Sequence, residues 1–379
     1  MRIVTAIDSF KGSLTSIEAG EAVKKGILKV NKDAEVHVRP LADGGEGTVD
    51  TLVSGMNGII QEVTAAGPLG KAVNCQYGII EDTKTAVIEM SGAAGITLVP
   101  DSQRNPLHTT TYGVGEVIKD AIEKGCRRFI VGIGGSATND GGVGMLQALG
   151  YEFINKEGKE VPHGAVGLKE LRTIKDEKVL PELKDCTFKI ACDVTNPLCG
   201  EKGCSAIFGP QKGATPEMVE MMDKWLATYA DIAKEKYAKA DADYPGTGAA
   251  GGMGFAFLTF TNAELKSGID IVLEETNLEE YVKGADLVIT GEGRLDGQTA
   301  FGKAPAGVAK LAKKYDIPVI AFAGSVTKDA VKCNEIGIDA YFPILREVVT
   351  LDKAMNSENA KENLRDTAEQ VIRLINIRK

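Results

Sequence analysis

The chain has 379 residues, of which 43% are hydrophobic and 26% are charged, and its formal net charge is −9 at pH 7. This composition is that of an ordinary globular protein, and the length allows two domains with separate cores. The acidic balance, without a basic block, argues against nucleic acid or an anionic membrane surface as a partner. No stretch is apolar enough to span a bilayer and no signal-peptide pattern precedes the first strand, so we expect a cytoplasmic protein without a membrane partner.

The first part of the chain alternates buried strands with amphipathic helices. Residues 2–7 (RIVTAI) and 35–40 (EVHVRP) predict strands, residues 16–30 predict a helix between them, and a further helix is expected after Gly47. Strands of continuous apolar character that alternate with helices are typical of a parallel sheet covered on both faces.

The middle of the chain breaks this rhythm. The strand-like runs at 61–67, 72–80 and 85–91 leave no room for helices between them, so they are expected to pair antiparallel. Further strands are predicted at 128–133 and 188–194, and helices near 113–124, 141–149 and 216–240.

The strand–helix rhythm returns at the end, with strands at 285–290, 317–324 and 339–344 and helices near 305–315, 328–336 and 357–376. We therefore predict two α/β domains. The first is discontinuous, with a parallel sheet, and takes residues 1–60 and 283–379. The second is an inserted domain of mixed α/β character over residues 61–282.

Polar residues gather just after the predicted strands of the first domain. Ligands bind at the carboxyl ends of parallel strands, where the βα loops converge. The charged and polar residues at these positions include Glu292, to which we assign no role, and the candidates that we select, which are Asp8, Ser9, Lys11, Asp43, Arg294 and Asp296. The alternative for any single Asp or Ser is a helix cap, but caps explain the whole set less well.

The insertion repeats the pattern in glycine-rich loops. The stretch Val131–Gly144 (VGIGGSATNDGGVG) leads from a strand into polar residues, and Gly246–Gly254 opens an apolar helical run. Glycine-rich turns before helices expose backbone N–H groups to phosphate oxygens. The candidates of the insertion are Ser136, Asn139, Asp140, Asp193, Asn196 and Lys212.

Four other interpretations of the sequence compete with this one. The run Gly132–Ala137 matches G-x-G-x-x-A with Glu152 about twenty residues further on, which makes an NAD(P)-dependent dehydrogenase of a small hydroxy acid the alternative function. A hydrolase is disfavoured, because GGSAT is not the G-x-S-x-G nucleophile elbow. A non-catalytic sensor is disfavoured, because it would not need the carboxylates that this chain carries. GQTAFGKA, residues 297–304, is one residue short of a Walker A motif, because alanine stands at the position of Ser or Thr.

The stretches DSFKGSLTS, LADGGEGT, GIGGSATNDGG, ACDVTNPLCG, GPQKGA and GEGRLDGQTAFGKAPAGVA together resemble the bacterial type I glycerate kinases. The resemblance runs from residue 8 to residue 309 and implies ATP-dependent phosphorylation of D-glycerate with Mg²⁺, with 2-phosphoglycerate favoured over 3-phosphoglycerate as the product. It also implies that the discontinuous domain is flavodoxin-like and that the active site lies between the domains. The partners expected are D-glycerate and ATP, and the protein is expected to be a monomer or a homodimer.

The candidate residues then take roles in phosphoryl transfer, which depends on charge neutralisation and positioning. Asp193 is expected to act as base or metal ligand, and Lys11 and Arg294 to grip the glycerate carboxylate or the transferred phosphate. The metal ligands are predicted to come from Asp43, Asp193 and Asp296. The remaining candidates, assigned to binding of substrate or phosphate, are Asp8, Ser9, Asp43, Ser136, Asn139, Asp140, Asn196, Lys212, Gly302 and Lys303.

Overall fold

The computed structural model describes residues 1–42 and 47–377. Its contacts divide the chain into two compact units. One unit comprises Met1–Asp43, Asp50–Met56 and Ile269–Lys379, and the other comprises Gly44–Val49 and Asn57–Gly268. Two of the crossings between the units fall within helices, one in α2 (Thr48–Gly55) and one at the start of α10 (Gly268–Glu275).

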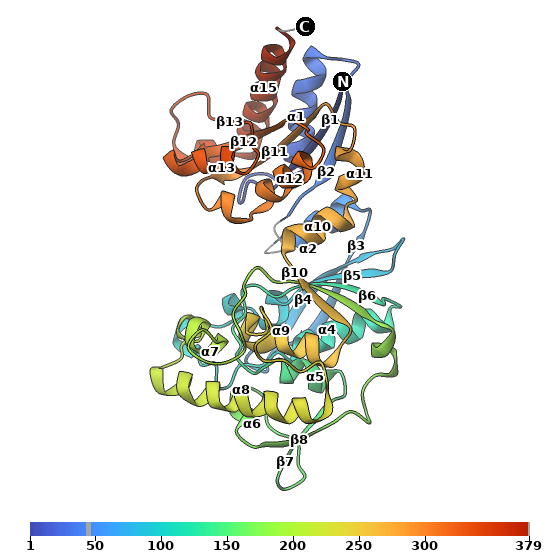
Figure 1. The fold of residues 1–379 in the computed structure, drawn as a ribbon, viewed down its shortest axis with the longest axis vertical. Helices are drawn as coiled ribbons and strands as arrows, with labels where there is room; N and C mark the ends of the chain where they lie inside the picture. The colour runs from blue at the N-terminus through green and yellow to red at the C-terminus, as the bar shows by residue number, and fades with distance from the viewer. Residues whose placement is uncertain (43–46, 378–379) are drawn as a thin grey trace. The chain divides into compact units, whose positions relative to one another are not determined.

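The first unit contains a five-stranded sheet in the order β13-β12-β11-β1-β2, and all its neighbouring strands run parallel (Figure 1). The parallel sheet is the one that the strand–helix rhythm predicts. Its strands are β1 (Arg2–Ile7), β2 (Glu35–Pro40), β11 (Leu287–Leu295), β12 (Val319–Val326) and β13 (Ala340–Pro343).

Both faces of this sheet are covered. Leu287 and Ile289 of β11 belong to the core beneath α1 (Ser16–Val30) and α15 (Ser357–Asn376), whereas the intervening Val288 is buried on the opposite face. Helices α1 and α15 approach so closely that a Cβ atom at Gly26 would lie 2.1 Å from the carbonyl oxygen of Arg365. The other helices of this unit are α11 (Leu278–Val282), α12 (Ala304–Lys313), α13 (Lys332–Glu335) and α14 (Leu351–Met355), with 3₁₀ turns η5 (Thr299–Phe301) and η6 (Lys328–Val331).

The second unit contains a six-stranded mixed sheet in the order β10-β9-β6-β5-β4-β3. The antiparallel pairing predicted for the first three strands is confirmed for β3 with β4 and for β4 with β5, and the remaining pairs are parallel. The strands are β3 (Ile59–Ala66), β4 (Ala72–Ile80), β5 (Thr85–Glu89), β6 (Arg128–Gly132), β9 (Thr187–Ala191) and β10 (Ala263–Lys266); β7 (Glu152–Asn155) and β8 (Leu171–Lys175) form a separate antiparallel pair.

The second unit has its own core, in which Phe129 stacks on Phe188 at 4.7 Å between ring centroids. Its helices are α3 (Ser91–Ala94), α4 (Tyr112–Glu123), α5 (Val143–Ala148), α6 (Ala165–Leu168), α7 (Cys204–Phe208), α8 (Pro216–Lys236) and α9 (Ala249–Phe260), and its 3₁₀ turns are η1 (Ile96–Leu98), η2 (Asp101–Gln103), η3 (Pro181–Asp185) and η4 (Pro210–Lys212).

Two helices differ from the predicted ranges. The helix expected over 216–240 ends at Lys236, because Tyr237 takes an extended conformation that places its ring 4.6 Å from that of Phe260 and its hydroxyl 3.0 Å from Asp176. The helix expected over 328–336 consists of the 3₁₀ turn η6 followed by the short α13.

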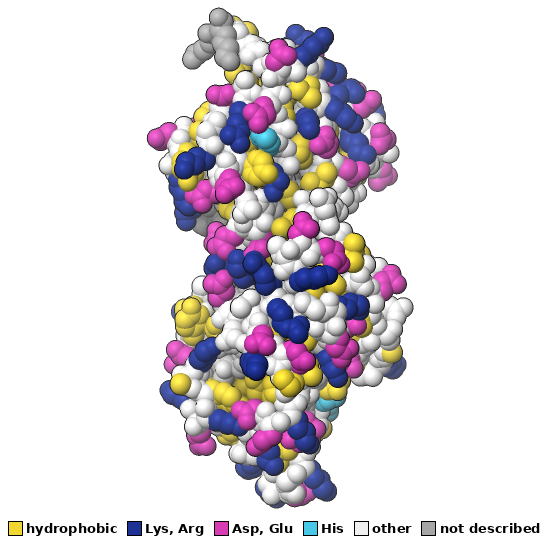
Figure 2. Space-filling view, turned by 90° about the vertical axis from the view of Figure 1, so that its right-hand side faces the viewer, with side chains coloured by type: hydrophobic (Ala, Val, Ile, Leu, Met, Phe, Trp, Pro, Cys, Tyr) yellow, Lys and Arg dark blue, Asp and Glu magenta, His cyan; other side chains and the backbone are white. Residues whose placement is uncertain are grey.

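On the face that Figure 2 shows, Lys and Arg side chains are interspersed with Asp and Glu side chains. Within the described part of the chain, no helix is both long and apolar enough to cross a membrane.

Candidate functional site

The carboxyl end of β1 places Asp8 against the neighbouring strand. The backbone N–H of Asp8 donates to the carbonyl of Gly291 at 2.9 Å, and its carboxylate accepts from the N–H of Ser9 at 2.7 Å. Asp8 is buried, whereas Lys11 is exposed. Asp43, a predicted metal ligand, lies outside the described residues.

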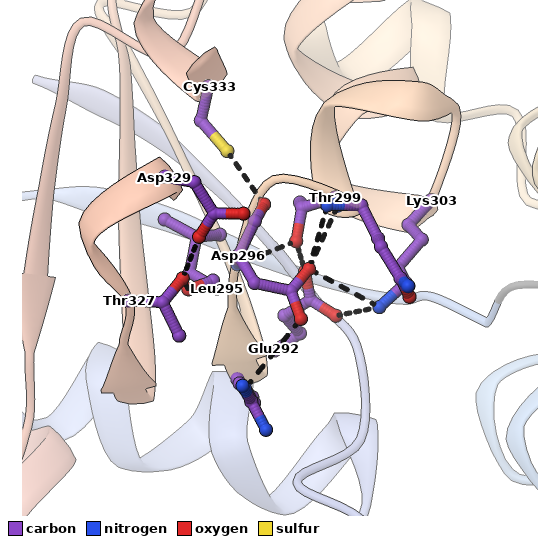
Figure 3. Close-up of polar contacts among 10 residues, drawn as sticks. Glu292, Leu295, Asp296, Thr299, Lys303, Thr327, Asp329 and Cys333 are labelled. Carbon is purple, nitrogen blue, oxygen red and sulfur yellow. Dashed lines mark hydrogen bonds and ion pairs between the residues drawn. The ribbon is translucent and has the colours of Figure 1, made fainter. Parts of the chain in front are cut away.

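A cluster of charged side chains forms where β11 ends (Figure 3). The hydroxyl of Thr299 donates to Glu292 Oε1 at 2.6 Å, and Lys303 Nζ lies 4.0 Å from Glu292 Oε2 and 3.9 Å from Asp296 Oδ1. Asp296 also lies 3.6 Å from Arg294 Nε. The structure therefore brings three predicted residues, Arg294, Asp296 and Lys303, around one point.

Two features of this cluster differ from the sequence prediction. Strand β11 runs to Leu295, so Arg294 lies within the strand and not in the loop after it, and its side chain remains 67% exposed. Glu292, noted after the predicted strand but given no role, is only 8% exposed and lies next to Lys303. The sequence contained one signal for this residue: an acidic side chain directly continues the run of the predicted buried strand. Buried residues are rarely charged unless they are paired.

The near-match to a Walker A motif proves to be a different structure. Residues 299–301 form the turn η5, Gly302 has a φ of 110°, and Lys303 caps α12 with Pro305 in its first turn. This arrangement is not the strand–loop–helix of a P-loop. Lys303 nevertheless stands at a helix N-terminus, where backbone N–H groups favour anions.

In the second unit, the loops after β6 and β9 are hydrogen-bonded to the start of α9 and the residue before it. The N–H of Gly141 donates to the carbonyl of Gly251 at 2.9 Å, and the N–H of Gly248 donates to the carbonyl of Asn196 at 3.0 Å. Gly251 has a φ of 69°, and a Cβ atom there would lie 2.1 Å from the carbonyl oxygen of Thr138. Glycine is needed at this position because two backbones meet.

Asp140 fixes this group of loops from inside. Its buried carboxylate accepts from the N–H and the hydroxyl of Thr111, both at 2.9 Å, from the N–H of Gly142 at 3.1 Å and from the N–H of Gly144 at 3.4 Å. Burial raises the pKa of this carboxyl, and the surrounding donors oppose the increase. Asp140 therefore ties the start of α4 to the start of α5.

Lys212 is the other buried ion of this region. Only 2% of it is exposed, and its ammonium donates to Ser136 Oγ at 2.8 Å and to the carbonyl of Thr138 at 2.6 Å. Burial lowers the pKa of Lys212 to about 8. The adjacent Asn139 donates to the hydroxyl of Ser205 at 2.8 Å.

These contacts qualify the roles predicted from the sequence. Four of the candidates have buried side chains that form hydrogen bonds within the protein: Ser136, Asn139, Asp140 and Lys212. These hydrogen bonds stabilise the backbone conformation of the glycine-rich region. Direct contact of these side chains with substrate or phosphate stays a prediction.

Replacing Lys212 with Met is expected to change how stability depends on pH. An unfolded lysine titrates near 10.5 and the folded Lys212 near 8, so between these values the unfolded chain binds more protons and the free energy of unfolding rises with pH. The slope approaches about 1.4 kcal/mol per pH unit for one proton. Urea titrations at about pH 7, 8.5 and 10 should show wild-type gaining stability relative to K212M as pH rises.

Trp225, the single tryptophan, lies in α8 and reports the unfolding of this unit by its fluorescence. The matched control is Lys234→Met, since Lys234 is exposed on the same helix. The difference between wild-type and K234M should not change with pH. A pH-independent difference for K212M as well would contradict the buried-ammonium interpretation.

Asp193 and Asn196 follow β9, as predicted. Asp193 is exposed, and its Oδ1 accepts from the N–H of Gly268 at 3.1 Å. Asn196 donates from Nδ2 to the carbonyl of Lys202 at 2.8 Å. The hydrogen-bonded loops thus place Asn196 beside the glycine-rich region, with Asp193 at the same end of the sheet.

The motif that favoured a dehydrogenase lacks its structural context. Gly132 ends β6, but α5 begins only at Val143, so no tight strand–turn–helix presents a helix N-terminus to a dinucleotide. Glu152 lies in β7, which belongs to the separate two-stranded sheet and not to the strand beside β6.

Comparisons with known proteins agree over the whole length. The profile of the glycerate kinase family matches residues 3–376. A glycerate kinase of Bacillus subtilis is 48% identical over 379 residues, covering 100% of this chain and 99% of the relative, and glycerate 2-kinase of Escherichia coli is 49% identical over 354 residues, covering 93% of each. The crystal structure of a protein provisionally named glycerate kinase 2, from Salmonella typhimurium, has a TM-score of 0.92 at 46% identity and covers 100% of this chain and 98% of its own. The chain therefore belongs to the glycerate kinase family.

Proposed function

We propose that this enzyme transfers a phosphoryl group from ATP to D-glycerate and that the product is 2-phosphoglycerate. The observation that carries the proposal is the identity of 49% with glycerate 2-kinase of Escherichia coli over 93% of both chains. The dehydrogenase alternative gains no support, because the relatives that match along the full length are kinases. The chemistry of the candidate residues agrees with phosphoryl transfer, since carboxylates, lysines, an arginine and glycine-rich loops are its usual components.

Mg²⁺ fits the residues of the cluster at the end of β11. Glu292 and Asp296 each offer a carboxylate oxygen within 4.0 Å of Lys303 Nζ, and Mg²⁺ is commonly bound by one or two carboxylates together with substrate phosphates. Within residues 1–42 and 47–377, no group of three or more His, Cys, Asp or Glu residues could enclose a metal by itself. Bound Mg²⁺ would neutralise phosphate charge, while Lys303 and Arg294 would orient the phosphate oxygens.

We propose that Asp193 accepts the proton of the glycerate hydroxyl or acts as a metal ligand, and that Lys11 and Arg294 hold the glycerate carboxylate or the transferred phosphate. We further propose that the chain forms two domains with the predicted boundaries, 1–60 with 283–379 and 61–282, and that the substrates meet in a cleft between these domains. Limited proteolysis tests the boundaries. If residues of both units contribute to one active site, Asp193→Asn and Arg294→Lys, which lie in different units, should both reduce turnover. Wild-type turnover in either variant would contradict the cleft.

A coupled assay of ADP release tests the main proposal. The purified chain with ATP, D-glycerate and Mg²⁺ should release ADP, and NMR of the product should show phosphate on the second carbon. Removal of Mg²⁺ with a chelator should abolish turnover, and NAD⁺ in place of ATP should give no reaction. Product phosphorylated on the third carbon would overturn the position but not the kinase activity; no ADP release would overturn the function.

The cytoplasmic location and the monomeric or homodimeric state stay predictions. Light scattering after size-exclusion chromatography would distinguish a monomer from a homodimer. A larger assembly would contradict the expectation.

A further inference from the structure

A cavity of about 710 Å³ opens in the second unit, away from the loops described above. It is bounded by residues that precede β9, by the end of α8 and the residues after it, and by the end of α9. Strands β9 and β10 are parallel, and the cavity lies at their amino ends, whereas Asp193 and Asn196 follow the carboxyl end of β9. The five residues of β9 separate the two ends by roughly 16 Å.

One wall of the cavity is aromatic. The ring of Phe260 lies 4.6 Å from that of Tyr237 and 5.2 Å from that of Tyr151, both measured between centroids, and all three residues line the cavity. The hydroxyl of Tyr151 donates to the carbonyl of Phe260 at 2.8 Å, which holds this wall in place. Ring edges and faces in this arrangement favour a planar apolar ligand body.

The charge of the lining is opposite to that of the protein. The lining contains three lysines, Lys184, Lys236 and Lys239, and no carboxylate, although the chain carries a net charge of −9. Lys236 is paired with Asp176 at 2.6 Å. Lys184 and Lys239 form no ion pair with any residue that the structure describes, and Lys239 donates only to the carbonyl of Thr261 at 3.3 Å and to Asn262 Oδ1 at 3.5 Å.

A buried hydroxyl adds a polar group to the lining. Thr259 is 4% exposed, and its Oγ1 has no hydrogen-bond partner among the described residues. Ligand sites typically have volumes of about 300–1,000 Å³ and combine apolar walls with a few polar groups. We propose that this cavity binds a planar organic anion, with its rings against Phe260 and Tyr237 and its carboxylate, phosphate or sulfonate group between Lys184 and Lys239.

The aromatic sulfonate 8-anilinonaphthalene-1-sulfonate is a suitable probe, because Trp225 is the single tryptophan and lies on the helix that borders the cavity. Trp225 precedes Lys236 by eleven residues (236 − 225) of α8, which corresponds to roughly 16 Å along the helix. Excitation of Trp225 should therefore sensitise emission of the bound dye. The variant Trp225→Phe should bind the dye but lose the sensitised signal.

Neutralising both unpaired lysines, in Lys184→Gln/Lys239→Gln, should weaken dye binding about five- to tenfold, as expected for two partly exposed ion pairs. The matched control Lys169→Gln/Lys234→Gln changes the net charge equally at exposed positions outside the lining and should bind like wild-type. The neutral probe N-phenyl-1-naphthylamine should bind more weakly than the sulfonate and be insensitive to the lysines.

The proposal is independent of the kinase function, since none of these residues lies in the candidate active site. Turnover of D-glycerate by the double variant should remain at the wild-type level, and ATP with glycerate should not displace the dye. Unchanged dye affinity in the double variant, or displacement by the substrates, would overturn the proposal. If the double variant is destabilised, the single variant Lys239→Gln can replace it in the test, and its dye affinity should fall about two- to fourfold.

Discussion

Replacing Asp193 with Asn is expected to lower kcat about 10²–10³-fold, the effect typical of removing one charged group from a transition state. An amide has the same shape as the carboxylate but does not take up the proton of the attacking hydroxyl or balance the charge of a metal ion. The oxygen of the substituted amide would still accept the hydrogen bond that Asp193 Oδ1 receives from Gly268 at 3.1 Å, so the fold should be preserved. The ADP-release assay measures the loss.

The control for this experiment is Asp185→Asn. Asp185 is exposed and stands before β9, so it lies at the opposite end of the strand that Asp193 follows. This variant should turn over at the wild-type rate, because a charge at that end of the sheet is far from the loops of the candidate site. Near wild-type kcat in D193N would exclude Asp193 as the catalytic carboxylate.

Replacing Asp140 with Ala is expected to destabilise the second unit by about 3–5 kcal/mol. The substitution leaves the buried donors of Thr111, Gly142 and Gly144 without their acceptor. Each unsatisfied buried donor costs about 1–3 kcal/mol, and the sum is reduced because water enters the space that the carboxylate leaves. Urea titration followed by Trp225 fluorescence reports this unit alone, which matters because a chain of two compact units need not unfold in one step.

Asp231→Ala on α8 provides the comparison, since Asp231 is exposed and its loss should change stability by less than about 0.5 kcal/mol. The two variants remove the same side chain, once from the buried network and once from the surface. Equal stabilities would show that the hydrogen bonds around Asp140 do not hold the loops together.

Much of the fold could be predicted because it depends on local patterns. The strands at 2–7 and 35–40 and the helices at 16–30 and 357–376 were predicted with their observed bounds, since buried apolar runs and amphipathic spacing are properties of neighbouring residues. The end of α8 could not be predicted, because it depends on the contact of Tyr237 with Phe260 and Asp176, which are distant in the chain.

The candidate site was predictable in part for the same reason. Arg294 and Asp296 were selected from their place after a strand, and Lys303 from its place before the next predicted helix; the structure brings the three together. The sequence indicated the place of Glu292 but not its role, since its contacts with Thr299 and Lys303 require the turn η5 to fold back on β11. The family itself was identifiable from the motifs, and the comparisons confirm it.

By itself the sequence determined the order of the elements, the parallel sheet and the chemical character of the loops, because strand alternation and the residues that follow each strand are written in consecutive positions. Only the tertiary structure decided which polar side chains face inward. Lys212 and Asp140 belong to glycine-rich loops that resemble open phosphate sites in sequence, yet both are buried and bonded to backbone. The reason is that burial of an ion depends on donors and acceptors supplied by distant segments, which no local pattern contains.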